Sequence, residues 1–218
     1  MGTKERRARE QLETREKILN AAREMFAEAG YEAVTMRAIA QRIEYTPTAI
    51  YHHFKNKHAL LTELCRGDFA VLARHFNTAA VPSDPVQRIL GVGEAYLRFA
   101  ERFPSQYRFM FMTVIPELEL GEDYIAQTRG NPESDAYAFL RESCRLAIDQ
   151  GRLRPEIEDA DELAQILWAG VHGLISLRIV KARQDWIPWR DLGATARQSM
   201  QIMVRGILRE PGGKKRRS

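Results

Sequence analysis

Apolar side chains recur every three or four positions along most of the chain, and alternating runs of the kind that form β-strands are missing. This spacing is typical of helices that bury one face. It predicts an all-α protein of about nine helices, with residues 1–13 as a loose basic arm and residues 116–132 as an irregular, turn-rich segment. The expected helices cover residues 14–30, 36–43, 47–54, 56–80, 84–103, 104–112, 133–150, 161–181 and 188–208.

The stretch from Thr35 to Lys57 predicts two short helices joined by a tight turn. Thr46 can cap the second helix, and Pro47 has the fixed φ that suits a first helical position. Polar side chains on the second helix are left outside the core, at Thr48, Tyr51, His52 and His53. A short helix with such a face fits the major groove of DNA, so the stretch predicts a helix-turn-helix. Spacing alone does not separate it from the helix pairs common in helical proteins.

The surrounding residues carry a more specific pattern. Over about the first 60 residues they resemble the TetR family of bacterial transcriptional regulators. The positions that carry the resemblance are Ile18, Ala21, Ala22, Phe26, Gly30, Tyr31, Thr35, Ile39, Ala40, Tyr51, Phe54, Lys57, Leu60 and Leu61.

The resemblance implies DNA contacts. Arg37 matches a family position that reaches a base or a phosphate, and Tyr51 and Lys57 match phosphate-binding positions. Thr46, Pro47 and Thr48 match the tip of the recognition helix. His52 and His53 occupy positions that vary among relatives, so we expect them to help set the sequence preference. As neighbours on one helix they do not converge on a metal, and we expect neither metal nor cofactor.

The turn between the two helices departs from the family. Relatives usually have glycine where this chain has Glu44. A glutamate there must either avoid a left-handed φ or accept strain.

Charge divides the chain into three parts. Residues 1–60 hold 11 Lys and Arg against 8 Asp and Glu, residues 61–208 hold 17 against 20, and residues 209–218 hold 5 against 1. The basic first part suits DNA binding at residues 1–60, and the basic end at 209–218 is expected to be a disordered tail. The resemblance implies that residues 61–208 form an effector-binding and dimerisation domain. No signal peptide and no apolar run of bilayer-spanning length is evident, which predicts a cytoplasmic protein without membrane contact. Cys65 and Cys144 are expected as buried apolar residues.

The segment from Trp168 to Gly173 resembles the Trp-His-Gly segment of one C-terminal domain type among TetR-like regulators. Trp168 and His172 lie one turn apart on the same helical face. They and the aromatic residues of other predicted helices suit either a pocket for a small organic effector or an ordinary core. The candidate effector residues are Tyr96, Phe99, Phe103, Tyr107, Phe111, Tyr137, Trp168 and His172.

These patterns and the resemblance together predict a homodimeric repressor that binds palindromic double-stranded operator DNA and is released by a small effector. The last two predicted helices carry more apolar residues than one subunit needs, at Leu163, Ile166, Leu167, Leu174, Met200, Met203, Val204 and Ile207, which favours a dimer interface. Two alternatives remain. One is a helical protein-interaction module. The other is an enzyme, for which the phosphate-loop, nucleophile and metal motifs are missing.

Overall fold

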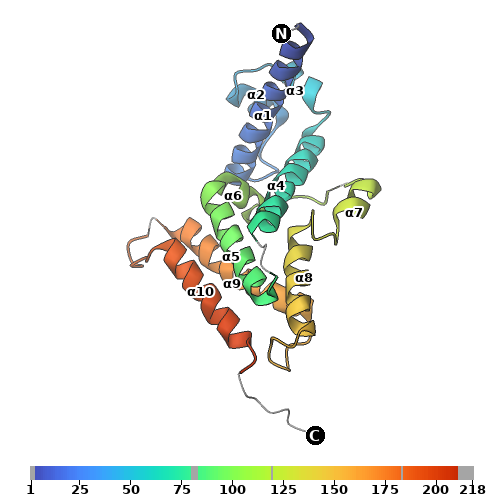
Figure 1. Ribbon diagram of the computed structural model, residues 1–218. Coiled ribbons are helices and arrows are strands. Elements are labelled where there is room, and N and C mark those ends of the chain that lie inside the picture. Colours follow the sequence, from blue (N-terminus) through green and yellow to red (C-terminus); the bar gives the residue numbers. More distant parts are fainter. Residues whose placement is uncertain (1–2, 80–82, 119, 183, 211–218) are drawn as a thin grey trace. The chain divides into compact units, whose positions relative to one another are not determined.

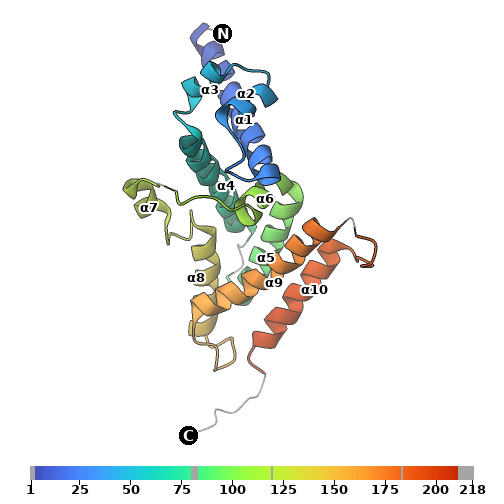
Figure 2. The same cartoon turned by 180° about the vertical axis from the view of Figure 1, so that it is seen from behind.

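The computed structural model describes residues 3–79, 83–118, 120–182 and 184–210, and over these residues it is helical without strands (Figures 1 and 2). The predicted all-α fold is confirmed. The ten helices in the described part are α1 (Thr3–Ala29), α2 (Met36–Arg42), α3 (Pro47–His53), α4 (Lys57–Ala79), α5 (Pro85–Arg102), α6 (Pro104–Met112), α7 (Glu122–Thr128), α8 (Ala136–Asp149), α9 (Ala160–Lys181) and α10 (Leu192–Ile207).

The helices form two compact units, and neither unit is a single segment of chain. The first unit comprises Met1–Phe69 and Phe103–Glu122, and the second comprises Ala70–Arg102 and Asp123–Ser218. The long helix α4 therefore begins in the first unit and ends in the second. Helix α6, which the sequence placed in the effector domain, belongs to the first unit.

The core of the first unit is built on one face of α1. Ile18, Ala22 and Phe26 recur at helical spacing and are fully buried, together with Ile50 of α3. Helix α6 closes this core, because Phe109 is also fully buried and its ring lies 6.1 Å from that of Phe26. The two short helices α2 and α3 are thus held by α1 and by the start of α4.

Helix α1 begins eleven residues earlier than the hydrophobic pattern indicated. The loose arm expected at residues 1–13 was wrong from Thr3 onward, since residues 3–13 continue α1 as an exposed helix. Its Arg, Lys, Glu, Gln and Ala residues are strong helix formers, and Arg6 pairs with Glu10 one turn later at 3.5 Å. The segment expected to be irregular likewise contains α7. The basic end, Lys214–Arg217, lies outside the described residues.

The second unit is built from α5, α8, α9 and α10, with the last part of α4. Helix α10 approaches its neighbours closely because glycines face its methionines. A Cβ added at Gly93 of α5 would lie 2.0 Å from the sulfur of Met200, and one at Gly170 of α9 would lie 2.3 Å from that of Met203. Gly170 therefore permits close helix packing, whereas Gly173 faces open space.

Helix α9 is more apolar than the sequence pattern suggested. Among the described helices it alone is long and apolar enough to cross a membrane. In its most apolar stretch, 28% of the residues are buried within the protein. We had expected no such stretch, because small and isolated polar residues interrupt its apolar runs. One helix of this kind is weak evidence for a membrane span, since helices of soluble proteins meet the same criteria.

Both cysteines are buried, as expected. Burial raises the pKa of the Cys144 thiol to about 12, and burial and the charge of Asp68 do the same for Cys65. Both thiols therefore stay protonated and unreactive at neutral pH.

Candidate nucleic-acid interface and effector site

Threonine caps position the two short helices. The hydroxyl of Thr35 accepts a hydrogen bond from the Ala38 amide at 3.1 Å at the start of α2, and that of Thr46 accepts one from the Ala49 amide at 3.3 Å at the start of α3. Pro47 occupies the first position of α3. These contacts fix both helix starts. The sequence predicted the start of α3 at Thr46 and Pro47, whereas the cap at Thr35 is an observation of the structure.

The outer face of α3 is polar and accessible. Ile50 is fully buried and anchors the helix, while Thr48, Tyr51 and His52 point outward. Tyr51 is 53% exposed, so its ring and hydroxyl are available to a partner. Arg37 on α2 is exposed as well. The helix therefore presents a row of hydrogen-bonding side chains over a buried apolar base.

The turn between α2 and α3 places Glu44 at a φ of +59°. Within the described residues it is the one non-glycine residue with a positive φ. Glu44 therefore adopts the left-handed conformation that glycine provides in relatives, and it accepts the strain. The turn keeps its backbone hydrogen bond from the Tyr45 amide to the Ala40 carbonyl at 2.9 Å.

Lys57 and His53 lie where α3 meets the first turn of α4. The Lys57 ammonium donates to the Tyr31 carbonyl at 2.9 Å and sits 4.0 Å from the centroid of the Tyr31 ring. It retains donors for a further partner because an ammonium has three. His53 is half-buried, and burial with the nearby charges of Arg15 and His52 lowers its pKa, so the ring is neutral at pH 7.

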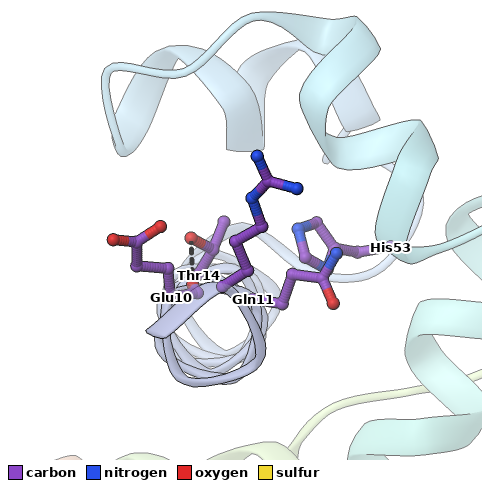
Figure 3. A pocket seen from close by; sticks show the side chains of 5 residues that line it. Glu10, Gln11, Thr14 and His53 are labelled. Atoms are coloured by element: carbon purple, nitrogen blue, oxygen red, sulfur yellow. Dashed lines mark hydrogen bonds between the residues drawn. The ribbon is translucent and has the colours of Figure 1, made fainter. Parts of the chain in front are cut away.

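A shallow groove of about 270 Å³ lies between α1 and the end of α3 (Figure 3). Arg7, Glu10, Gln11, Thr14 and His53 line it. Gln11 lies on the side of α1 toward His53, whereas Glu10 points to the other side. The sequence could not predict this groove, because residues 1–13 carry no apolar periodicity that would have revealed the helix.

In the second unit, four candidate effector residues form a continuous aromatic cluster. The Tyr96 hydroxyl and His172 Nδ1 are 3.0 Å apart, and the His172 ring lies 6.2 Å from that of Trp168. Trp168 in turn lies 6.4 Å from Tyr137, whose hydroxyl donates to Asp161 at 2.8 Å. Burial lowers the pKa of His172. The structure thus brings together residues of α5, α8 and α9.

The accessible part of this cluster is on α8 and α9. Tyr96 and Phe99 are buried in the core, whereas Tyr137 and His172 are half-buried and Trp168 is 37% exposed. Phe103, Tyr107 and Phe111 belong to the first unit, where Tyr107 is fully buried and packs its ring 5.2 Å from that of Phe111. The predicted effector residues are therefore divided between the two units.

Two family models match the chain. The model described as bacterial regulatory proteins, tetR family, matches residues 18–64, and the model for the tetracyclin repressor-like C-terminal domain matches residues 89–205. The second match alone covers more than half of the chain. This chain belongs to the TetR family. All the candidate DNA-binding residues lie in the first match and all the candidate effector residues lie in the second.

Relatives agree with this TetR assignment. The chain is 42% identical over 197 residues to the HTH-type transcriptional regulator UidR of Escherichia coli strain K12, covering 89% of this chain and 93% of that protein. It is 28% identical over 155 residues to the HTH-type transcriptional repressor AcnR of Corynebacterium efficiens, covering 67% of this chain and 72% of the relative.

Solved structures show the same fold. The TetR regulator PfmR of Thermus thermophilus aligns with a TM-score of 0.67 at 24% identity, covering 88% of this chain and 96% of that one. The ketosteroid regulator KstR2 of Mycobacterium tuberculosis aligns with a TM-score of 0.65 at 20% identity, covering 90% and 96%. The chain is thus a helix-turn-helix transcriptional regulator that binds operator DNA. This assignment favours the regulator over both the enzyme and the interaction module.

Proposed function

We propose that this TetR-family regulator is a cytoplasmic homodimeric repressor that binds a palindromic operator through α3 and is released by a small apolar or aromatic effector. The observation that carries the DNA-binding part is the outer face of α3, where Thr48, Tyr51 and His52 are exposed over the buried Ile50. Such a face can enter a major groove while its base stays packed on α1.

The side chains divide into two roles. Tyr51 and Lys57 bind phosphates and position the helix, with Lys57 held in place by Tyr31. Thr46, Pro47 and Thr48 form the tip that approaches the groove, Arg37 reaches it from α2, and His52 and His53 bias the choice of base sequence.

Selection of duplexes from a random DNA library by the purified protein tests this division. Tyr51→Phe and Lys57→Ala should weaken binding to all duplexes about equally, whereas His52→Ala should change which sequence is selected. If Lys57→Ala left both affinity and its salt dependence at wild-type values, the phosphate role of Lys57 would be wrong.

The effector part rests on a connection from the aromatic cluster to α4. Phe76 of α4 lies 6.4 Å from Tyr96, which contacts His172. The Asn77 amide of α4 also donates to the Glu133 carbonyl at 2.9 Å, just before α8. A molecule bound against Trp168 and His172 would therefore shift groups that hold the far end of α4.

Helix α4 can transmit this shift because the same helix carries Lys57 at its other end. Two recognition helices of a dimer meet successive major grooves only when they lie about 34 to 36 Å apart. An effector that favours another pose of α4 changes that spacing, and by linkage DNA lowers effector affinity by the same factor. Differential binding of a few kcal/mol is sufficient for release.

The dimer part rests on apolar surface that the protomer leaves exposed. Ile166, Leu177, Val180 and Ile202 of α9 and α10 are all more than half exposed. The sequence had assigned Leu163, Leu167, Met200 and Val204 to the interface, but these side chains are buried within the subunit. Ile166 belongs to the predicted interface and is exposed, whereas Leu177, Val180 and Ile202 lie at other positions of the same two helices. A second copy would cover all four.

A further inference from the structure

The first three turns of α1 extend beyond the core of the first unit. Ile18 is the first residue of α1 that is fully buried, and residues 4–13 are exposed throughout. At 1.5 Å per residue, residues 3–13 form an extension of about 16 Å. An exposed helix of this length buries little apolar surface and so contributes little to the free energy of folding. The placement of its charges is therefore relevant to binding rather than to folding.

The carboxylates of this extension are unevenly distributed around the helix. The α1 face that buries Ile18 continues toward the N-terminus as Lys4, Arg7, Gln11 and Thr14, at heptad spacing. This row, the cationic face, has no carboxylate. Helical geometry places Glu5, Arg9, Glu13 and Glu16 on the opposite side. The face of α1 that is apolar from Ile18 onward therefore carries cationic and neutral polar side chains before it.

The cationic face borders the recognition helix. Arg7, Gln11 and Thr14 line the groove whose other wall is His53, at the end of α3 (Figure 3). Glu10 lines the groove as well, on the flank of α1 away from Gln11, where it pairs with Arg6 at 3.5 Å. The groove therefore presents the cation of Arg7 between a carboxylate that is already paired and neutral polar side chains, next to α3.

We propose that the cationic face of α1 is a second DNA-binding surface, in which Lys4 and Arg7 bind phosphates beside the site read by α3. The proposal rests on the proposed DNA-binding function. Duplex DNA is the partner because the cationic face is continuous with the helix-turn-helix surface, opposite in charge to the phosphate backbone and free of apolar side chains. A helix of 10–12 Å is too wide for a minor groove of about 6 Å, and in the proposed function α3 occupies the major groove. The contacts proposed for Lys4 and Arg7 are therefore to the phosphates and independent of sequence.

Charge reversal on the two faces provides a matched test. Arg7→Glu and Arg9→Glu change the net charge equally, on the same exposed helix, but only Arg7 lies on the cationic face. Each full-length variant is titrated with a 40-base-pair duplex that carries, at its centre, a sequence selected by the wild-type protein. A salt series gives the number of phosphate contacts, and Tyr51→Phe serves as a control on α3.

Arg7→Glu should weaken binding by on the order of tenfold at 0.1 M salt and flatten the plot of log K against log salt by about 0.9 per lost contact. Arg9→Glu should stay within about twofold of wild type, and the sequence selected by Arg7→Glu should be unchanged. Equal effects of Arg7→Glu and Arg9→Glu, or wild-type binding by Arg7→Glu while Tyr51→Phe is weakened, would overturn the second surface and leave the role of α3 intact. Salt-independent binding by the wild type would overturn both proposals.

Discussion

Two side chains at the DNA-binding face are constrained in ways that only the structure reveals. Glu44 holds a backbone conformation that L-residues rarely adopt, and Lys57 is held by both the carbonyl and the ring of Tyr31. The first constraint costs free energy of folding, whereas the second stabilises a cation at a defined place. Each constraint can be tested by replacing one residue.

Replacing Glu44 by glycine should stabilise the protein modestly. The substitution relieves about 1 kcal/mol of left-handed strain and loses part of that gain to the greater freedom of glycine in the unfolded chain. We expect the free energy of unfolding in urea to rise by a few tenths of a kcal/mol. Glu16→Gly, in the middle of α1 with ordinary helical geometry, should instead lower it by about 1 kcal/mol. A loss for Glu44→Gly as large as that for Glu16→Gly would contradict the strain.

Acid should destabilise the protein partly through His172. Burial lowers the pKa of His172 in the folded state, so the unfolded chain binds the proton more readily. Stability is therefore unaffected well above pH 6.5 and falls as the pH drops through that value. His172→Gln should reduce the decrease in melting temperature between pH 7.5 and pH 5, and an unchanged decrease would contradict the contribution of His172. His53 and His75, whose pKa values are also lowered, retain part of the effect.

At the level of helices, a buried carboxylate joins three elements of the first unit. Asp68 of α4 is almost fully buried and accepts hydrogen bonds from Arg23 of α1 at 2.7 and 2.9 Å. Gln106 of α6 donates a third at 3.0 Å. The carboxylate thus joins α1, α4 and α6 next to the point where α4 leaves the unit.

Removing Arg23 should be costly because it leaves the charge of Asp68 buried. Arg23→Met should lower the free energy of unfolding by about 3 kcal/mol. Arg42→Met is the control, because its pair with Glu24 is exposed and longer, at 3.8 Å, and should cost less than about 1 kcal/mol. Adding Asp68→Leu to Arg23→Met should recover part of the loss. Chemical denaturation measures the free energy of unfolding of the three variants. Equal losses for Arg23→Met and Arg42→Met would contradict a stabilising role of the buried pair of Arg23 and Asp68.

The sequence predicted the helices with strong apolar periodicity and missed those without it. Helices α2, α3 and α5 carried capping threonines or prolines and a clear buried face. Residues 3–13 of α1 are helical through charged helix formers alone, so no apolar face marked them. The link at Asp68 could not be foreseen either, because its partners are 45 and 38 residues away.

The sequence predicted the placement of the candidate DNA-binding residues better than that of the candidate effector residues. The family resemblance named the exposed residues of α3, where local caps determine which side chains point outward. It could not separate buried from accessible aromatic residues, as Tyr96 and Trp168 show. That distinction depends on which helices pack together, and aromatic spacing carries no such information.

At the scale of the whole molecule, α9 has a buried and an exposed apolar face, and α10 adds one exposed isoleucine, Ile202. One face packs into the second unit, where Gly170 receives Met203, and the other remains in contact with water. A monomer would not be expected to expose Ile166, Leu177, Val180 and Ile202 together on two helices.

A charge in the exposed face should split the proposed dimer without unfolding the subunit. Ile202→Glu would place a carboxylate in an apolar interface, where desolvation costs several kcal/mol. We expect a monomer with a native circular dichroism spectrum at micromolar concentration in sedimentation experiments. The control is Gln201→Glu, an exposed polar position on α10 that lies about 100° around the helix from Ile202. A wild-type monomer at the same concentration would refute the dimer.

Variants in the aromatic cluster should uncouple DNA binding from release. Trp168→Ala and His172→Ala should bind the selected operator with wild-type affinity, because neither residue belongs to the first unit. The probe is the compound that raises the wild-type melting temperature most in a panel of small apolar and aromatic molecules. It should release wild type from DNA but not the variants. Release of a variant at the wild-type concentration would place the effector site elsewhere.

The placement of Phe109 against Phe26 also limits how such a regulator can be recombined. The first unit is interrupted by Ala70–Arg102 and resumes at Phe103, so a cut after residue 69 would remove α6 from its core. A chimeric sensor that joins the first 69 residues to a foreign ligand-binding half should therefore be poorly soluble. One that also carries residues 103–122 keeps its own α6 and should fold. The part of this protein that can be exchanged between regulators thus consists of two separate segments of the chain.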